Sequence, residues 1–237
     1  MQQFFDEIDD INDVGQVIHR TCGLISEQGV IRQSYYNFGP FASATSEKTS
    51  VISKGFPKEW TKLYDDWQFR AKNPIPKRVL EHGTMLTWLD AIKTKENSAE
   101  EREYLDAMQR YGLVHGFGVP LFGVFACDAY ASFDFGKPVE EVSQPEVGLV
   151  RALAQIGHQR ACILIKQSED SYELSERETE VLEWLALGKS IWAVACILDL
   201  SPDTVKTYCK RIYAKLDVSD RVGAVVTALK LGLIKLH

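Results

Sequence analysis

A short polar run, Gln167-Ser168-Glu169-Asp170-Ser171, separates two parts of the chain that differ in their hydrophobic periodicity. Before this run, helical periodicity alternates with strand-like stretches, whereas after it every apolar pattern is helical. This change predicts two domains, at 1–166 and 174–237, joined by a linker at 167–173. With 237 residues, of which 45% are hydrophobic, the chain is long enough to give each domain a core of its own.

The first part of the chain combines helices with strands. The expected helices are Val14–Gln28, Lys58–Leu63, Pro74–His82, Ala99–Tyr111 and Pro145–Ile165. The expected strands are Gln33–Phe38, Lys48–Ser53, Gly116–Leu121 and Cys127–Phe135. This order predicts an α+β fold, in which an α/β/α sandwich is built on an antiparallel sheet, as in small sensor domains.

The second part of the chain is expected to fold into four helices. Ser175 and Glu178 form a capping box at the start of the first, and Gly188 marks its end. The later helices are expected at 190–198, 202–215 and 221–231. Two short helices joined by a tight turn, with the second one basic, are typical of a helix-turn-helix.

The third of these helices has an apolar and a polar face. The positions expected to point inward are Val205, Cys209 or Tyr208, Ile212 and Leu216. The positions expected to point outward are Lys206, Thr207, Lys210 and Ala214, with Arg211 and Lys215 beside them. Lysine can donate to guanine O6 and N7 in the major groove, and the free N–H groups of the helix start can hold a phosphate. On periodicity alone, a solvated charged face on a helical bundle is an equally good interpretation.

The net charge of −6 is unevenly distributed over the chain. Residues 201–237 contain seven Lys or Arg and three Asp, whereas residues 171–200 contain six acidic and two basic residues. An acidic protein with a basic terminal segment can bind DNA, because attraction to phosphate is local and is screened within about 10 Å. A double-stranded DNA partner is therefore compatible with this composition.

Other sequence features argue against several classes of protein. The five cysteines are scattered, without a CxxC pair or a metal-ligand spacing, so we expect reduced thiols and no bound metal. The chain starts with acidic residues rather than a secretory signal, and its most apolar segment, Phe117 to Phe133, contains Asp128. We therefore expect a cytoplasmic protein with no membrane partner. Without a G-x-S-x-G or H-E-x-x-H motif, an enzyme is not expected either.

The segment LSERETEVLEWLALGKSIWAVACILDLSPDTVKTYCKRIYAKLDVSDRVGAVVTALKLGLI, at 174–234, resembles the DNA-binding domain of the LuxR family over its whole length. The residues that carry the resemblance are Arg177-Glu178, Val181-Leu182, Gly188-Lys189, Ala195, Leu198, Ser201, Thr204-Val205-Lys206, Lys215-Leu216 and Arg221. The DNA contacts that it implies are Lys206, Thr207 and Lys210 as base-reading residues, together with Thr204, Arg211 and Arg221.

Three positions of this segment depart from the family pattern. Ala193 stands where a glutamate is usual, Asp199 where the turn often has glycine, and Asp220 where asparagine is common. None of these changes removes a core position, so the resemblance still implies a DNA-binding domain.

The first domain resembles the autoinducer-binding domains of the quorum-sensing branch of the same family. The matching segments are GFPKEWTKLYDDWQFRAKNPIPKRV (55–79), TMLTW (84–88) and YGLVHGFGVPLFG (111–123). Trp184 and Trp192 in the second domain also match this branch. The resemblance implies a ligand-responsive transcriptional regulator whose ligand is usually an N-acyl homoserine lactone, and it implies no other cofactor.

The same resemblance implies which residues contact the ligand. The Trp60 indole N–H would donate to the lactone carbonyl, and the Tyr64 hydroxyl, one helical turn later, would reach the acyl carbonyl. Trp88 would pack on the lactone ring, Gly116 would leave room that a side chain would fill, and Ser132 would donate a further hydrogen bond. Taken singly, each of these residues is also well explained as part of a core.

The remaining contacts are apolar, with one polar exception. Phe56 and Phe69 are expected to form walls around the acyl tail. Asn73, before Pro74, stands where the family normally has an aspartate. Asparagine accepts only a neutral hydrogen bond and adds an NH₂ group that needs its own acceptor. Three outcomes are therefore open: weaker binding of acyl homoserine lactones, a ligand with a different head group, or a receptor that acts without ligand.

The resemblance also indicates a homodimer on a palindromic operator, because such operators are usually paired half-sites. The helix at 145–165, and the last helix of the chain as a second element, are expected to form the dimer. Two alternatives are an orphan regulator that needs no ligand and a protein that sequesters another regulator as a heterodimer.

Overall fold

The computed structural model describes residues 7–38, 43, 46–124, 127–168 and 173–235, with the backbone alone at 166–168. The chain divides into two compact units, and the long helix of the first reaches the division between Ile165 and Lys166. Residues 169–172 of the expected linker lie outside the described residues. The part of that linker at 167–168 is the end of a helix.

A five-stranded antiparallel sheet forms the centre of the first unit. Its strands are β1 (Arg32–Asn37), β2 (Ser50–Lys54), β3 (Leu86–Thr87), β4 (Phe117–Leu121) and β5 (Ala129–Asp134). They are arranged in the order β2-β1-β5-β4-β3, and every neighbouring pair is antiparallel. This order brings segments that are nearly 100 residues apart, β1 and β5, side by side.

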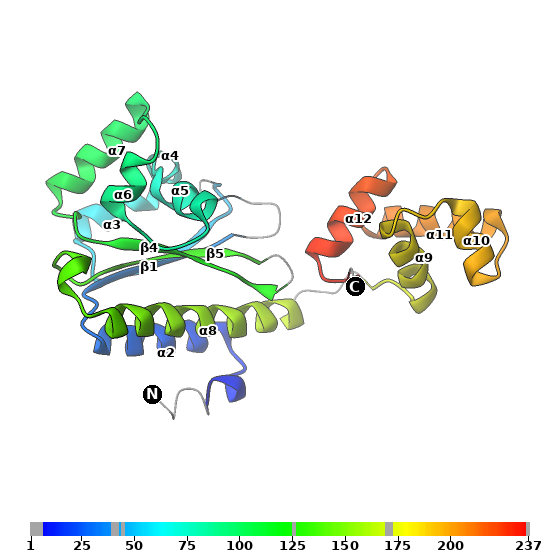
Figure 1. Ribbon diagram of the computed structural model, residues 1–237, viewed down its shortest axis with the longest axis horizontal. Helices are drawn as coiled ribbons and strands as arrows, with labels where there is room; N and C mark the ends of the chain where they lie inside the picture. The colour runs from blue at the N-terminus through cyan, green and yellow to red at the C-terminus, as the bar shows by residue number, and fades with distance from the viewer. Residues whose placement is uncertain (1–6, 39–42, 44–45, 125–126, 169–172, 236–237) are drawn as a thin grey trace. The chain divides into compact units, whose positions relative to one another are not determined.

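Helices cover both faces of this sheet (Figure 1). One face packs against α2 (Val14–Glu27) and α8 (Gln144–Ser168). The helices on the other face are α3 (Lys58–Asp65), α4 (Trp67–Ala71), α5 (Ile75–His82), α6 (Trp88–Lys93) and α7 (Ala99–Arg110). Short 3₁₀ turns, η1 (Ile8–Asp10) and η3 (Val139–Glu141), precede α2 and α8. The predicted α/β/α sandwich is confirmed.

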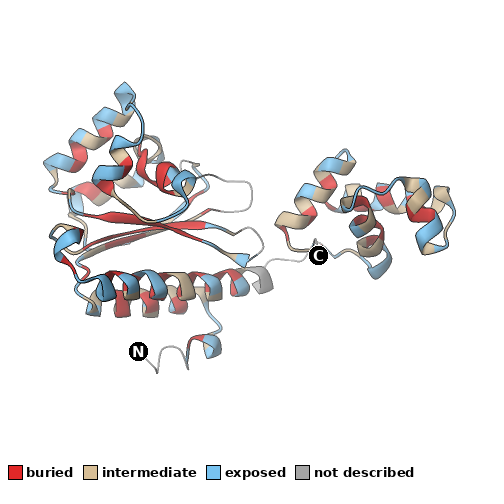
Figure 2. Cartoon of the chain, viewed as in Figure 1, coloured by how far each residue is buried: buried red, intermediate tan, exposed pale blue. Residues whose placement is uncertain are grey.

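Each face of the sheet has its own hydrophobic core, because side chains alternate along a strand. On β1, Tyr35 packs into the core beneath α2 and α8, whereas Tyr36 belongs to the core beneath α3–α7. On β5, Tyr130 lies in the same core as Tyr36, and Phe133 lies in the opposite one. Both β4 and β5 are buried along their whole length (Figure 2).

The elements that the sequence did not predict are short. α4 has five residues, and its N-cap is Asp66, whose side chain accepts a hydrogen bond from the Gln68 N–H. α6 has six residues, and its N-cap Thr87 accepts a hydrogen bond from the Asp90 N–H. β3 has only two residues. Elements of this length show too few residues for a period to be recognised. Together they bring Trp88 to the edge of the sheet.

The second unit is helical and is built on a separate core. Its helices are α9 (Glu176–Ala186), α10 (Ile191–Leu198), α11 (Pro202–Lys215) and α12 (Arg221–Lys230). The capping box of Ser175 and Glu178 is present at the start of α9. The tight turn between α10 and α11 uses Asp199 in a left-handed conformation, with φ of 54°. The predicted four-helix domain with a helix-turn-helix is confirmed.

Among the helices of the described residues, none combines the length and the apolar character that crossing a membrane requires.

Candidate functional site

A cavity lies between the sheet and the helices α3–α7. Its lining residues are Ser34, Tyr36, Val51, Ser53, Phe56, Trp60, Tyr64, Asn73, Ile75, Trp88, Tyr104, Met108, Leu113, Tyr130 and Ser132. Six of the predicted ligand contacts are among them: Phe56, Trp60, Tyr64, Asn73, Trp88 and Ser132. The structure therefore brings together residues that are up to 76 positions apart in the sequence.

Trp60 lies at the centre of an aromatic cluster in this cavity. Its ring centroid is 5.5–5.9 Å from those of four other aromatic side chains: Tyr64, Phe69, Tyr104 and Tyr111. The residue is 4% exposed, and none of the hydrogen bonds between the described residues involves its indole N–H. An indole nitrogen is a donor only, so this N–H is available to an acceptor atom of a bound molecule.

Tyr64 is the hub of a buried hydrogen-bond network. Its hydroxyl oxygen accepts a bond from the Asn73 amide Nδ2 at 2.8 Å and one from the Tyr104 hydroxyl at 3.4 Å. It also bonds to the Tyr36 hydroxyl. Because a phenol oxygen accepts two hydrogen bonds and donates one, Tyr64 must be the donor to Tyr36. Burial raises the pKa of Tyr64, although its hydrogen-bond partners oppose this, so the hydroxyl keeps its proton.

Asn73 has an amide group whose orientation is fixed by the backbone. The Ile75 N–H donates to Asn73 Oδ1 at 3.0 Å, at the start of α5. A backbone N–H can only donate, so the oxygen must face Ile75 and the NH₂ group must face Tyr64. Asn73 is 6% exposed. This side chain therefore both accepts a hydrogen bond from the first residue of α5 and lines the cavity.

Gly116 is one of two predicted ligand contacts that do not line the cavity. A Cβ atom at this position would lie 2.5 Å from Trp88 Cη2 and closer still to two other atoms of the ring. The Trp88 N–H also donates to the Gly116 carbonyl at 2.8 Å. The room that this glycine leaves is therefore filled by the Trp88 indole, which in turn lines the cavity.

Two other predicted contacts are placed more simply. Ser132 faces the cavity from β5, and its hydroxyl bonds to that of Ser34 at 2.7 Å. Phe69, predicted as a wall, is not among the lining residues; it packs against Trp60 and Tyr104 instead.

The sequence prediction missed the cavity residues contributed by β1 and α7. Ser34 and Tyr36 are two residues apart on a strand, and Tyr104 and Met108 are four apart on a helix, so each pair shares one face. These two spacings are the sequence signal that could have identified the cavity residues of β1 and α7. The pairing of Tyr36 with Tyr130 across β1 and β5 was not readable from either segment alone.

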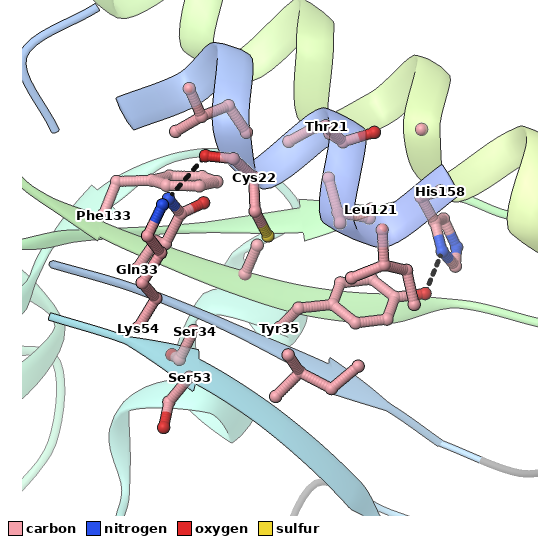
Figure 3. A pocket seen from close by; sticks show the side chains of 16 residues that line it. Thr21, Cys22, Gln33, Ser34, Tyr35, Ser53, Lys54, Leu121, Phe133 and His158 are labelled. Atoms are coloured by element: carbon pink, nitrogen blue, oxygen red, sulfur yellow. Dashed lines mark hydrogen bonds between the residues drawn. The ribbon is translucent and has the colours of Figure 1, made fainter. Parts of the chain in front are cut away.

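A second cavity lies on the opposite face of the sheet beneath α2 and α8 (Figure 3). No predicted ligand contact lines it. Its polar groups bond to one another: Tyr35 to His158 at 2.8 Å, and the Gln33 amide to the Cys22 carbonyl at 2.9 Å. Burial lowers the pKa of His158 to about 4, against the opposing effects of the Cys127 backbone and Asp128. This cavity offers a ligand few polar contacts.

The candidate DNA-binding face lies on α11. The positions predicted to point inward, Val205, Cys209, Ile212 and Leu216, are buried. The exposed positions are Lys206, Thr207, Lys210, Arg211, Ala214 and Lys215. Lys206 is paired with Asp203 at 3.0 Å, in an exposed ion pair that competes weakly with a phosphate or a base.

Three other residues of this domain have structural contacts. Thr204 is held at the start of α11, where its N–H donates to Ser201 Oγ at 3.1 Å. The Arg221 guanidinium donates to the Leu185 carbonyl and so joins α12 to α9. Lys215 donates to the buried Glu178 at 2.6 Å. Arg221 and Lys215 thus help to hold the helix-turn-helix in place.

The fold and these two surfaces define a two-domain protein: an α/β/α domain with a small-molecule cavity, followed by a helix-turn-helix domain. Residues 14–161 match the family described as autoinducer binding domain. Residues 172–228 match the bacterial regulatory proteins of the LuxR family. The chain belongs to the LuxR family of quorum-sensing transcriptional regulators with an autoinducer-binding domain, as the sequence predicts.

Individual relatives agree with this assignment. The quorum sensing-dependent transcriptional regulator RpaR of Rhodopseudomonas palustris is 28% identical over 187 residues, which is 78% of this chain and 76% of that one. The transcriptional activator LuxR of Aliivibrio fischeri is 24% identical over 214 residues, 86% of this chain and 84% of that one. The structure of Escherichia coli SdiA has the same fold, with a TM-score of 0.71 at 20% identity over 99% of this chain and 98% of that one.

Proposed function

We propose that this regulator binds a palindromic operator as a homodimer when a small acylated molecule occupies the cavity at Trp60. The candidate ligands are acylated lactones, the class to which the N-acyl homoserine lactones belong, and related small molecules. The observation that carries the ligand part is the Trp60 indole N–H in the cavity lining, which takes part in none of the hydrogen bonds between the described residues. Leaving such a donor unsatisfied costs roughly 1–3 kcal/mol, which a ligand carbonyl would recover.

The cavity composition supports a ligand with a polar head and an apolar tail. Phe56, Val51 and Leu113 supply apolar lining, whereas Trp60 and Asn73 supply hydrogen-bond donors. SdiA, which shares the fold with a TM-score of 0.72 at 21% identity, has been solved in complex with octanoyl-rac-glycerol. An acylated molecule of that kind has the division of polar and apolar groups that this cavity matches. Binding without turnover is proposed, so the protein is not an enzyme.

Two surfaces support the proposed homodimer. On α12, Val222 and Val226 are 71% and 43% exposed and lie four residues apart, so they form an apolar strip on one helix face. On α8, Ile163 is exposed. Exposed apolar side chains gathered on one helix face favour association with a second copy. A dimer would place two α11 helices on the paired half-sites of one operator in the cytoplasm, where the DNA is.

The DNA part of the proposal is tested by binding of palindromic duplexes selected from a random pool. We expect Lys206→Ala, Thr207→Ala and Lys210→Ala to weaken binding, each by about 1–3 kcal/mol if the side chain contacts a base edge. Lys235→Ala, an exposed lysine outside α11, is the matched control and should have little effect. If no palindromic duplex binds at low salt, with or without ligand, the sequestering heterodimer partner becomes the better interpretation.

The ligand part is tested by native mass spectrometry of the protein expressed with and without candidate lactones. We expect a stoichiometric ligand mass that is lost in Trp60→Phe, which removes the indole N–H and keeps an aromatic ring. Trp67→Phe is the matched control, because Trp67 is 40% exposed and does not line the cavity. A stable, folded dimer that binds its operator without any bound mass would instead identify an orphan regulator.

A further inference from the structure

The polar groups at the Trp60 end of the cavity face it as hydrogen-bond donors. The Trp60 indole offers one N–H, and Asn73 Nδ2 offers the hydrogen that it does not give to Tyr64. The structure provides neither hydrogen with an acceptor among the residues that it describes. The oxygen of the Asn73 amide is already used by the Ile75 N–H at 3.0 Å.

The Tyr64 hydroxyl between these two groups cannot serve as an acceptor for a ligand. Its oxygen already accepts bonds from Asn73 at 2.8 Å and from Tyr104 at 3.4 Å, and its own hydrogen goes to Tyr36. A phenol oxygen has no third site for a donor. The serine hydroxyls of the lining, those of Ser34, Ser53 and Ser132, can still adapt, but they lie on the strands of the sheet, where Ser34 and Ser132 bond to each other at 2.7 Å.

We propose that the ligand presents oxygen acceptors and no N–H group to Asn73, so that it is an ester or a ketone carrying an acyl tail rather than an N-acyl amide. This inference rests on the proposed function, because it concerns the ligand of the same cavity. An amide N–H at this position would oppose the NH₂ group of Asn73, donor against donor. An ester oxygen or a ketone carbonyl would accept from it.

Rotating the Asn73 amide would remove this conflict between donors but would create another. Turning its oxygen toward the ligand and Tyr64 would place the NH₂ group against the Ile75 N–H. That backbone N–H, at the buried start of α5, would then have no acceptor. Aspartate at this position has no such constraint, since both of its oxygens accept. Asn73→Asp should therefore reverse the preference for the head group.

The test uses two probes that differ in one atom of the link. One is N-octanoyl homoserine lactone, and the other is α-octanoyloxy-γ-butyrolactone, in which an ester oxygen replaces the amide N–H. Dissociation constants for both are measured by calorimetry on the full-length wild type and on Asn73→Asp, and again with butanoyl and dodecanoyl tails. Thermal unfolding of both proteins without ligand verifies that they are folded.

We expect the wild type to bind the ester about tenfold more tightly than the amide, and Asn73→Asp to bind the amide about tenfold more tightly, within the range for one unsatisfied buried donor. An ester carbonyl is a weaker acceptor than an amide carbonyl, but this difference affects both proteins alike. It therefore cancels when the ester-to-amide ratio of dissociation constants in the wild type is divided by the same ratio in Asn73→Asp. Equal ratios in the two proteins, or a wild type that prefers the amide, would overturn the inference and leave the receptor function intact. If Asn73→Asp does not fold, the wild-type preference alone decides.

A different result would overturn the proposed function itself. If neither probe binds either folded protein at any tail length, while DNA binding persists, the cavity is not a receptor site for acylated lactones. The two failures are therefore distinguishable by the same set of titrations.

Discussion

Stability of the first domain should depend on pH through His158. This histidine on α8 is 2% exposed, and its Nδ1 bonds to the Tyr35 hydroxyl at 2.8 Å. Burial lowers its pKa from 6.5 to about 4, while the Cys127 backbone and the charge of Asp128 act in the opposite direction. The native imidazole therefore stays neutral between pH 6.5 and pH 4, whereas the same group in the unfolded chain becomes charged.

The sign of the effect follows from proton uptake. Between these two pH values the unfolded state binds more protons than the native state, so stability falls as pH falls. At pH 7 both states are neutral and the contribution is fully present. The whole difference in pKa corresponds to roughly 3 kcal/mol, of which about 2 kcal/mol should be lost between pH 7 and pH 4.5.

The assay is urea unfolding of the full-length protein at pH 7, 6, 5 and 4.5, followed by tryptophan fluorescence. His158→Gln is the comparison, because glutamine can still bond to Tyr35 but does not titrate. We expect the wild type to lose about 2 kcal/mol more than the variant over this range. Parallel pH profiles for the two proteins, or an NMR titration that places the His158 pKa near 6.5, would refute the reasoning.

Two further substitutions have defined outcomes. Gly116→Ala places a methyl group against the rigid Trp88 ring and should lower the free energy of unfolding by about 1–3 kcal/mol. Gly23→Ala is the control, because a methyl group there enters open space and should not lower it. Equal melting temperatures for the two variants would contradict this prediction. Glu178→Gln removes the charge that binds Lys215 at 2.6 Å and should cost about 1–2 kcal/mol. Burial alone would raise the pKa of Glu178, but its partners lower it overall. The cost should therefore shrink as the wild-type carboxylate is protonated in acid, and a constant difference would argue against the ion pair.

Much of the fold could be predicted from local signals in the sequence. The capping box at Ser175 and Glu178, and Gly188 just after the end of the same helix, are chemical features of a few adjacent residues. The helix positions predicted from them agree with the structure to within a few residues. α4, α6 and β3 could not be predicted, because two to six residues give no measurable period.

Part of the site could be predicted from the sequence, and there is a physical reason why the rest could not. Trp60 and Tyr64 lie four apart on one helix, so their common face follows from spacing. Tyr36 and Tyr130 meet only through the register of β1 with β5, which no local pattern contains. The direction in which the Asn73 amide points depends on the Ile75 N–H and on a tyrosine nine residues away. Sequence identifies this side chain as unusual, and only the geometry identifies it as a donor.

The alternation of Tyr35 and Tyr36 along β1 has a consequence for how the first domain tolerates insertions. Tyr36 supplies the hydroxyl network of the ligand cavity, and Tyr35 supplies the partner of His158 on the opposite face. Adding or removing a single residue before them would turn each tyrosine to the other face. An added residue would move Tyr35 into the cavity position of Tyr36 and place Ser34 opposite His158, whereas a removed residue would move Tyr36 opposite His158 and place Asn37 in the cavity. Each change therefore takes the phenol from one face while the other face keeps one. The hydrogen bonds on both faces of the sheet therefore depend on the register of one strand, β1.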